Sequence, residues 1–272
     1  LQFKKKTALK KVLHEASDAG ISFPLIAKPD IGMKAYAVEK IGNEAQLLSY
    51  IHKIPGDYLL QELIDFPNEI GIFYVRFPDD VSGEITGIVS KEFLSVTGNG
   101  RDTIIQLIKQ NSRSYFQLPA LKRQYGDLLN RILHDNDKFL LVPYGSHTRG
   151  SKFTDISHLL NEKLLNTINS VCTKIRGFYF GRIDIRYSTF EELCDGKNFS
   201  IIEINGAGSE PTHIYDPGHS VFFAWKEIVR HWKLLYQISK INFEKGNPYL
   251  SFKDGRNMLK ANKKLEAQLK MI

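Results

Sequence analysis

The spacing of apolar residues along the chain predicts a succession of helices and strands. Apolar residues recur every three or four positions after Thr7, which we expect to cap a helix, and Gly20 ends this pattern. Asn43 is expected to cap a second helix. The longest helical pattern covers residues 219–240. Its apolar residues have the spacing expected of a buried helix face: Trp225, Ile228, Trp232, Leu235 and Ile238.

Strands are predicted where short apolar or alternating runs lie between turn residues. They cover residues 23–28, 35–40, 58–64, 69–77, 84–93, 139–142, 177–187 and 199–205. A further helix is predicted over 161–176. This order lacks the regular alternation of strand and helix that builds a doubly wound parallel sheet. Two α+β lobes that share a cleft fit the order better.

The same pass along the chain predicts its domain boundaries. Residues 1–64 are expected to form a small lobe, which ends at a hinge, Asp65-Phe66-Pro67. Residues 65–245 are expected to form a large lobe with a helical insert over about 102–136. Residues 246–272 are polar and are expected to form a basic C-terminal tail.

Composition is that of an ordinary globular protein, with 42% apolar and 25% charged residues among 272. No run approaches eighteen uninterrupted apolar residues, so we expect no membrane-spanning helix. Cys172 and Cys194 are the only cysteines. Two thiols build neither a disulfide scaffold nor a zinc cluster, so we expect a reducing compartment and a cytoplasmic location.

The net charge of +7 is concentrated at the two ends of the chain. Residues 1–11 sum to +5 and residues 242–272 to +4, which leaves 7 − 9 = −2 for residues 12–241. A nucleic-acid-binding protein normally carries a basic stripe on its folded body. We therefore interpret the basic ends as solvated helix faces and expect neither a nucleic-acid nor a membrane partner.

The most informative chemistry lies on two successive strands. Because side chains alternate along a strand, Arg182, Asp184 and Arg186 share one face. Glu203 and Asn205 likewise share a face on the next strand. Two carboxylates and an amide are hard oxygen ligands that suit magnesium. Salt bridges between these carboxylates and arginines are the alternative, but the glycine-rich turn that follows Asn205 favours an anion site.

These motifs, R-x-D at 182–184 and E-x-N at 203–205, resemble the magnesium-binding strands of the ATP-grasp superfamily of carboxylate–amine ligases. The nearest members are D-alanine–D-alanine ligase and the ATP-grasp modules of cyanophycin and glutathione synthetases. The resemblance covers residues 7–240. It implies an α+β ATP-grasp fold, in which two lobes grip a nucleotide and the larger lobe has a mainly antiparallel sheet. Asp184, Glu203 and Asn205 would be the magnesium ligands.

The resemblance also implies the residues that hold ATP. Lys28, at the end of an apolar strand, corresponds to an ATP-binding lysine, although strand ends commonly carry lysine for other reasons. The loop that follows holds only one glycine where the family has several, and Lys34 is a substitute phosphate contact. The adenine-recognising segment corresponds to Gln61, Glu62, Leu63 and Ile64, and Glu69 corresponds to the ribose ligand.

Further site residues follow from the same resemblance. Lys91, Arg149 and Arg182 are implied as catalytic residues that face the transferred phosphate or a carboxylate. His147, beside Arg149, is more simply a surface histidine. The acceptor pocket would be lined by residues in and beyond the glycine-rich turn: Gly208, Ser209, Glu210, His213 and Tyr215.

The predicted function is an ATP- and magnesium-dependent ligase that activates a carboxylate as an acyl phosphate for attack by an amine. Its partners would be small-molecule carboxylate and amine substrates of the amino-acid or peptide class. The alternatives are an ATP-grasp phosphotransferase with a hydroxyl acceptor and a non-catalytic nucleotide-binding protein. The resemblance also implies an N-terminal substrate domain, which is missing from this chain, truncated, or supplied by another chain.

Overall fold

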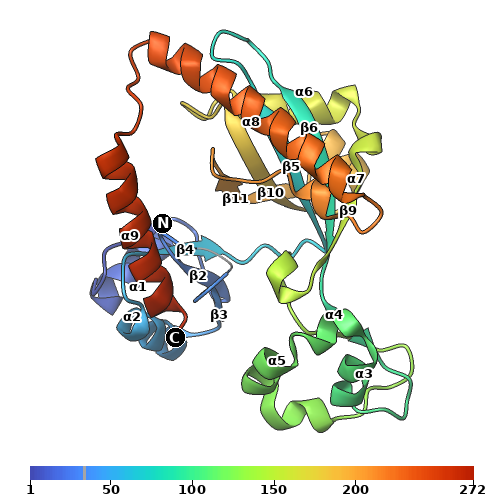
Figure 1. Cartoon of the computed structure of the whole chain (residues 1–272). Helices are drawn as coiled ribbons and strands as arrows, with labels where there is room; N and C mark the ends of the chain where they lie inside the picture. Colours follow the sequence, from blue (N-terminus) through green and yellow to red (C-terminus); the bar gives the residue numbers. More distant parts are fainter. Residues whose placement is uncertain (33–34) are drawn as a thin grey trace. The chain divides into compact units, whose positions relative to one another are not determined.

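The computed structural model describes residues 1–32 and 35–272. The chain divides into two compact units (Figure 1). The first unit consists of Leu1–Asp65 together with Pro248–Ile272, and the second unit consists of Phe66–Asn247. Both units combine helices with antiparallel sheet, so the predicted α+β class is confirmed.

The sheet of the first unit has the strand order β1-β4-β2-β3, and every neighbouring pair is antiparallel. Its strands are β1 (Gln2–Phe3), β2 (Leu25–Pro29), β3 (Glu39–Ile41) and β4 (Tyr58–Glu62). The predicted hairpin-like unit is confirmed by the pairing of Leu25 with Ile41, although β3 is shorter than the pattern over 35–40 indicated.

Three helices contribute to the core of the first unit: α1 (Leu9–Asp18), α2 (Glu44–Lys53) and α9 (Phe252–Leu269). The predicted cap of α2 is confirmed, because the Asn43 side chain accepts a hydrogen bond from the Gln46 N–H at 3.0 Å. The predicted cap of α1 is wrong. The helix follows Ala8 without a side-chain cap, and the Thr7 hydroxyl donates to the carbonyl of Lys4 instead.

Helix α9 lies where the sequence predicts a basic tail, and it belongs to the first unit. Leu269 is buried in the core of that unit and Leu265 packs against the same cluster. The lysines Lys260, Lys263 and Lys264 are exposed. The helix therefore adds an apolar edge to a core that begins near the other end of the sequence.

The second unit is built on a five-stranded antiparallel sheet with the order β11-β10-β5-β6-β9. The strands are β5 (Asn68–Val75), β6 (Glu84–Glu92), β9 (Lys152–Asp155), β10 (Phe180–Tyr187) and β11 (Phe199–Asn205). The two motif-bearing strands, β10 and β11, are therefore neighbours, with β11 at one edge of the sheet.

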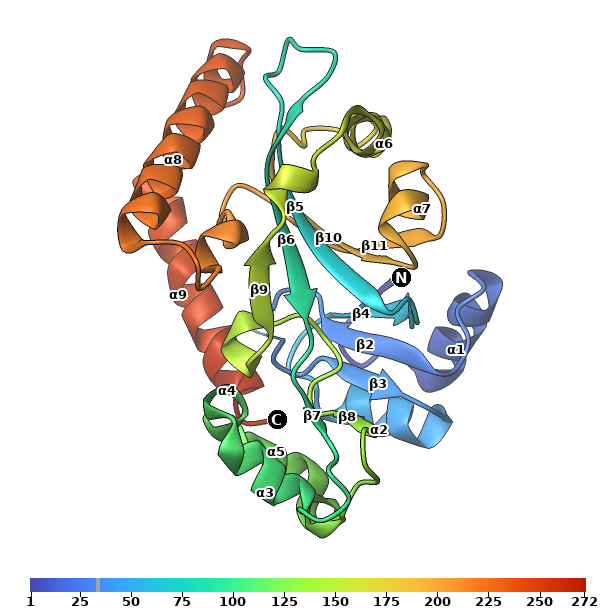
Figure 2. The ribbon, with the colours of Figure 1, turned by 90° about the vertical axis from the view of Figure 1, so that its right-hand side faces the viewer.

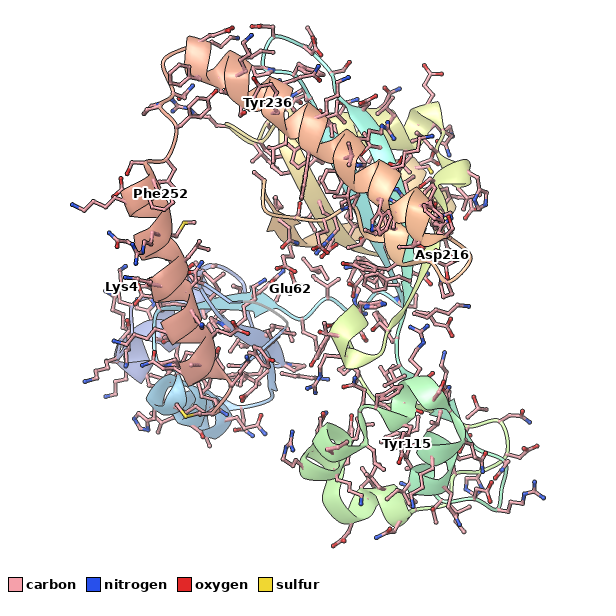
Figure 3. All side chains as sticks on the ribbon, viewed as in Figure 1. Lys4, Glu62, Tyr115, Asp216, Tyr236 and Phe252 are labelled. Carbon is pink, nitrogen blue, oxygen red and sulfur yellow. The ribbon has the colours of Figure 1, made fainter. Side chains whose placement is uncertain are left out.

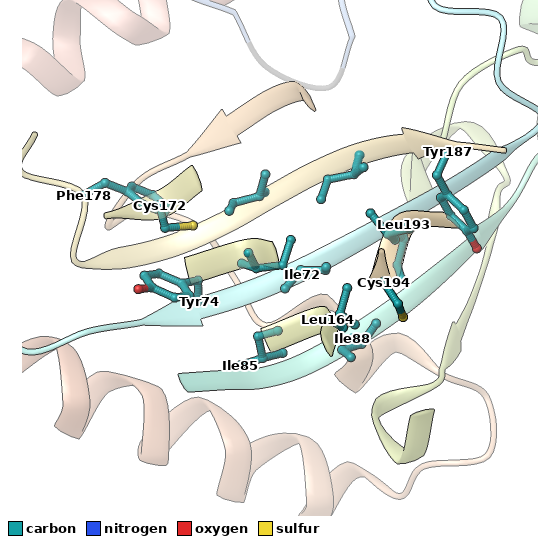
Figure 4. Packing of buried hydrophobic residues seen from close by; sticks show 14 residues of the cluster. Ile72, Tyr74, Ile85, Ile88, Leu164, Cys172, Phe178, Tyr187, Leu193 and Cys194 are labelled. Atoms are coloured by element: carbon teal, nitrogen blue, oxygen red, sulfur yellow. The ribbon is translucent and has the colours of Figure 1, made fainter. Parts of the chain in front are cut away.

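One face of this sheet carries the main apolar core. Helices α6 (Glu162–Cys172) and α7 (Phe190–Cys194) cover this face, with Leu164, Ile168 and Leu193 packed in the core (Figure 4). Alternate residues of the central strands point into it, among them Ile72 and Ile183. The residues between them, including Asp184, consequently point to the opposite face.

Helix α8 (Val221–Glu244) lies on the opposite side of the sheet from α6 and α7 (Figure 2). It packs through Ile238 against Phe73 and Phe180, so it covers only part of this second face. The predicted core positions Trp225 and Trp232 are wrong, because their side chains are 59% and 67% exposed. The helix instead turns a different side to the sheet, on which its buried residues lie: Glu227, His231 and Ile238.

A helical insert with its own apolar cluster follows β6. It contains β7 (Ser95–Thr97), α3 (Ile104–Gln110), α4 (Ser112–Tyr115), α5 (Leu118–Tyr125), η1 (Gly126–Asn130) and β8 (Lys138–Leu140). Thr103 and Gln106 form a reciprocal capping box at the start of α3. Short 3₁₀ turns complete the unit: η2 (His147–Arg149), η3 (Ser157–Leu159) and η4 (Thr212–Tyr215). In the described part of the chain, no helix has the length and apolarity needed to cross a membrane.

Candidate functional site

The polar residues of β10 and β11 stand in register. Asp184 lies directly opposite Glu203, and Arg182 lies directly opposite Asn205. Directly opposed residues of antiparallel strands project to the same face, so these four side chains share the face that lies away from the α6–α7 core. The predicted clustering of the two motifs is therefore present in the structure.

Asp184 is the centre of this cluster and is only 2% exposed. Arg182 donates to both of its carboxylate oxygens, from Nε at 2.9 Å and from a terminal nitrogen at 3.1 Å. The ammonium group of Lys91 lies 2.9 Å from the same carboxylate. Burial opposes ionisation of Asp184, but the two cations outweigh it and hold the pKa of this carboxyl below its usual range. Of the salt bridges in the alternative interpretation, the one between Arg182 and Asp184 is therefore formed, whereas Arg186 pairs with Glu69.

Lys91 joins Asp184 to a second buried carboxylate, Glu69. The Lys91 Nζ atom donates to Glu69 at 3.0 Å, and both side chains are almost fully buried. Arg186 approaches Glu69 from the other side, with Nε at 3.5 Å. The face thus holds a line of alternating charge from β5 and β6 to β10. Buried charges are tolerated when they are paired in this way.

Gly145 covers the Glu69–Lys91 pair of the cluster. Its N–H donates to Glu69 at 3.1 Å. A Cβ atom added at this position would lie 2.4 Å from a Glu69 oxygen and 2.5 Å from Lys91 Cδ. The loop therefore rests directly on the ion pair, at a distance that only glycine permits. Because of this contact, Glu69, the predicted ribose ligand, is buried beneath the loop.

Glu203 and Asn205 form the open side of the cluster. Glu203 is exposed, whereas Asn205 is half-buried and donates to Asp184 at 3.4 Å. Among residues 1–32 and 35–272, no three histidine, cysteine, aspartate or glutamate side chains come together as a metal site. The donor chemistry nevertheless suits magnesium, because the opposed strands present carboxylate and amide oxygens on one face. The role of these residues as metal ligands stays a prediction.

A second polar group gathers around η2 and the glycine-rich turn. Tyr215 donates to Glu210 and its ring stacks on His147 with centroids 4.8 Å apart. Burial, reinforced by Glu210, raises the pKa of Tyr215 to about 12. Two buried polar atoms in this region, Arg149 Nε and Ser209 Oγ, lack a hydrogen-bond partner within the described residues. Unsatisfied donors of this kind are typical of sites that a ligand completes.

His213, a predicted acceptor-pocket residue, lies in a different environment. It is 4% exposed and its ring packs over Gly87, where an added Cβ would lie 2.1 Å from Nδ1. Its Nε2 atom is 3.5 Å from Glu227 on α8, which also approaches His231. The link between η4 and α8 had no signal in the sequence, because His213 and Glu227 are more than a dozen positions apart. The other predicted residue of the turn, Gly208, is exposed.

In the first unit, two predicted nucleotide contacts meet. Lys28 on β2 donates to the Gln61 side chain on β4 at 2.8 Å. Glu62 ends β4 and is exposed, and Leu63 and Ile64 follow it in the connecting segment. Lys34, the predicted substitute phosphate contact, lies outside the described residues.

Two residues of the site were not predicted. Arg186 pairs with Glu69 and also donates to the carbonyls of Phe66 and Pro143, which ties β10 to both flanking segments. Its place on the shared strand face was the available signal. Gly145 gave none, because its contact with Glu69 spans 76 positions of sequence.

No protein-family model and no curated protein matches this sequence. Among solved structures, the chain is similar to a bifunctional glutathione synthetase from Pasteurella multocida, at 15% identity and a TM-score of 0.41 over 86% of this chain and 33% of that one. It is also similar to D-alanine–D-alanine ligase from Bacillus anthracis, solved with ATP. The identity is 14% and the TM-score is 0.48, over 90% of this chain and 62% of that one.

A third similar structure is the VanG D-Ala:D-Ser ligase from Enterococcus faecalis, at 13% identity and a TM-score of 0.44 over 87% of this chain and 55% of that one. The chain spans 33% to 62% of the length of these three proteins.

Proposed function

We propose that this chain is an ATP-dependent ligase that joins a carboxylate to an amine. The observation that carries the proposal is the register of β10 and β11, which sets Asp184 opposite Glu203 and Arg182 opposite Asn205 on one sheet face. Lys91 reaches the same cluster from β6. Cations and oxygen ligands placed together on rigid strands are suited to hold a polyphosphate and its metal.

In the proposed reaction, a carboxylate oxygen of the first substrate attacks the γ-phosphorus of ATP. An O–P bond forms as the bond from that phosphorus to the oxygen of ADP breaks. The amine of the second substrate then attacks the acyl carbon, the C–O bond breaks, phosphate leaves and the amine loses a proton. Such a sequence requires positioning and charge stabilisation rather than a covalent nucleophile on the protein.

Arg182 and Lys91 would hold the transferred phosphoryl group. Both are anchored on the Asp184 carboxylate, at 2.9 Å each, so their positions on the sheet are fixed before a ligand arrives. Phosphate oxygens would compete with Asp184 for these two cations. Arg149, whose Nε lacks a partner in the described part of the chain, would contribute a further charge from the neighbouring loop.

Glu203 and Asn205, with Asp184 once its cations turn to phosphate, would hold magnesium. When bound, the ion would neutralise charge on the phosphate oxygens. In the first unit, Lys28 and Gln61 would contribute to binding of ATP, as would the segment from Glu62 to Ile64. Lys34 completes the proposed ATP contacts, and Glu69, which is buried and paired with Lys91, would reach the ribose only if the loop at Gly145 moved away. Gly208, Ser209, Glu210, His213 and Tyr215 would line the acceptor side, for a substrate of the amino-acid or peptide class.

The test is thermal unfolding with ATP, with and without magnesium, on the natural chain and on Glu203→Gln. Ligand at about 100 times its Kd adds about 2.7 kcal/mol, or roughly 5–10 °C for a chain of this size. We expect a magnesium-dependent shift that Glu203→Gln abolishes. Glu84→Gln is the matched control, because it is exposed near the far end of the same sheet and should keep the shift.

Hydroxylamine trapping then separates the possible reactions. A carboxylate-activating ligase yields a hydroxamate together with ADP. A stable phosphoester formed with a hydroxyl acceptor would instead identify a phosphotransferase, and binding without ADP release a non-catalytic nucleotide-binding protein. No shift of the natural chain with magnesium and ATP would overturn the proposal.

A further inference from the structure

The outward face of α8 carries a row of large apolar side chains that no described residue covers. Their positions alternate in steps of three and four, so they line one side of the helix. This aromatic row consists of Phe222, Trp225, Val229, Trp232 and Tyr236. Tyr236 is labelled in Figure 3. Each of these residues is more than half exposed, from 59% for Trp225 to 73% for Phe222.

The row is not a consequence of poor packing of the helix. The opposite side of α8 is anchored, since Ile238 is buried against Phe73 and Phe180. His231 is 1% exposed and contacts Thr86 of the sheet at 2.9 Å. The helix thus has one side fixed on the sheet and presents a second apolar side outward. A contiguous exposed apolar patch on a folded protein commonly marks an interaction site.

Basic side chains run beside the aromatic row. Lys226, Lys233 and Lys240 recur every seven residues, the first two directly after Trp225 and Trp232, and all three are exposed. Arg230 is exposed on the same side and lies 3.3 Å from Glu227, and Lys240 lies 3.9 Å from Glu244 at the end of the helix. Helix α8 carries four basic residues and two acidic ones, Glu227 and Glu244, so its net charge is 4 − 2 = +2, and Glu227 is buried toward the sheet. The face that α8 presents is therefore both aromatic and positively charged.

We propose that this face of α8 binds the surface of an anionic lipid bilayer. Tryptophan and tyrosine combine an apolar ring with a polar group and prefer the region between headgroups and acyl chains. Lysines beside them extend their charged ends to lipid phosphates. A helix of 24 residues, about 36 Å long, lies along such a surface without crossing it.

Charge complementarity favours this occupant over a second copy of the chain. Pairing two copies of α8 would bring two basic edges together, because the two carboxylates of the helix, Glu227 and Glu244, already pair with Arg230 and Lys240 of the same copy. Anionic headgroups supply the opposite charge. The sequence analysis expects no membrane partner because the net charge of residues 12–241 is negative. That net charge does not describe the surface of α8, where the basic side chains are exposed and Glu227 is buried.

The chain carries its own probe for this contact, because Trp225 and Trp232 are its only tryptophans. We expect their fluorescence to move to shorter wavelength when vesicles of 70% phosphatidylcholine and 30% phosphatidylglycerol are added. Partition should be about tenfold stronger than to pure phosphatidylcholine, and 0.5 M salt should weaken it. An unchanged spectrum with the anionic vesicles would overturn the proposal.

Variants place the contact by sedimentation with vesicles. Trp225→Ser with Trp232→Ser should lower binding at least tenfold, whereas Tyr115→Ser with Phe116→Ser removes two exposed aromatic residues elsewhere and should not. Lys226→Gln, Lys233→Gln and Lys240→Gln together should lower binding about tenfold. The same change at Lys260, Lys263 and Lys264 on α9 keeps the net charge equal and should leave most of the binding.

Equal losses in these two lysine variants would mean that net charge, and not α8, drives binding, and would overturn the proposal. The proposal would also be overturned if the natural chain formed a dimer and the double tryptophan variant were a monomer. A fluorescence shift with single-stranded DNA and none with vesicles would overturn it as well. Circular dichroism of each variant shows that it is folded. None of the substituted residues belongs to the candidate site, so this test is independent of the proposed ligase activity.

Discussion

Asp184 and Glu203 face one another across β10 and β11, yet Asp184 is 2% exposed and Glu203 is open to solvent. The bulge that follows this pair shifts the register by one residue on β11. Asp184 therefore holds Lys91 and Arg182 in place, whereas Glu203 remains accessible to solvent. The difference makes the two residues separable by mutation.

Replacing Asp184 by asparagine should destabilise the second unit. The change leaves Lys91 with Glu69 as its remaining buried carboxylate and removes the buried partner of Arg182, and breaking a buried ion pair costs about 3–5 kcal/mol. Urea unfolding measures the change in free energy. Glu203→Gln, at an exposed position, should change it by about 0.5 kcal/mol or less. Similar losses in both variants would contradict the assignment of the anchoring role to Asp184.

Acid should lower the free energy of unfolding by protonating Asp184. The pKa of Asp184 is lower in the folded state than in the unfolded chain, where it is about 3.9. Its stabilising contribution is therefore complete above pH of about 4 and is lost as the pH falls through the folded-state value. The urea midpoint, followed from pH 6 to pH 3, should fall less steeply in Asp184→Asn. Parallel curves would show that this group does not control the acid response.

The buried histidines predict a second pH effect at a higher range. Burial lowers the pKa of His213 and of His231, against the attraction of Glu227 and, for His213, of Asp155. The unfolded chain then binds more protons, so stability should fall as pH drops below about 6.5. His213→Gln should flatten this dependence between pH 7.5 and 5.5. His158→Gln, at an exposed position, is the control and should leave the slope unchanged.

Gly145→Ala should lift the loop from the Glu69–Lys91 pair. The added methyl would overlap both side chains, and neither can move freely because each is buried and ion-paired. We expect a loss of about 1–3 kcal/mol and faster hydrogen exchange around Ser146 and Ser151. Gly206→Ala is the matched control, since nothing lies within 4 Å of its added Cβ. If the two variants were equally stable, the close contact of Gly145 with Glu69 and Lys91 would not contribute to stability.

The strand motifs were predictable because their signal is local. Alternation placed Arg182, Asp184 and Arg186 on one face, and the sheet keeps them there. The pairing of β2 with β3 and the Asn43 cap depend likewise on neighbouring residues. The Thr7 cap failed by one position, which is the usual scale of error at a helix end.

The failures concern contacts between distant parts of the chain. Periodicity identified an amphipathic pattern in α8 but not which side meets the sheet, and the tryptophans were assigned to the wrong side. The burial of His231 and Glu227 in their place depends on Thr86 and His213, which lie far away in sequence. The place of α9 in the first unit depends in the same way on a core that begins at Phe3.

The arrangement of the first unit also sets an order of events during synthesis. Leu265 and Leu269 complete a core whose remaining members come from residues 3–60, and Phe66–Asn247 is made between them. At typical rates of translation this interval is roughly 10–40 s. The second unit has all of its residues available before the first, so on the ribosome residues 3–60 gain their full set of packing partners only after the second unit has been made.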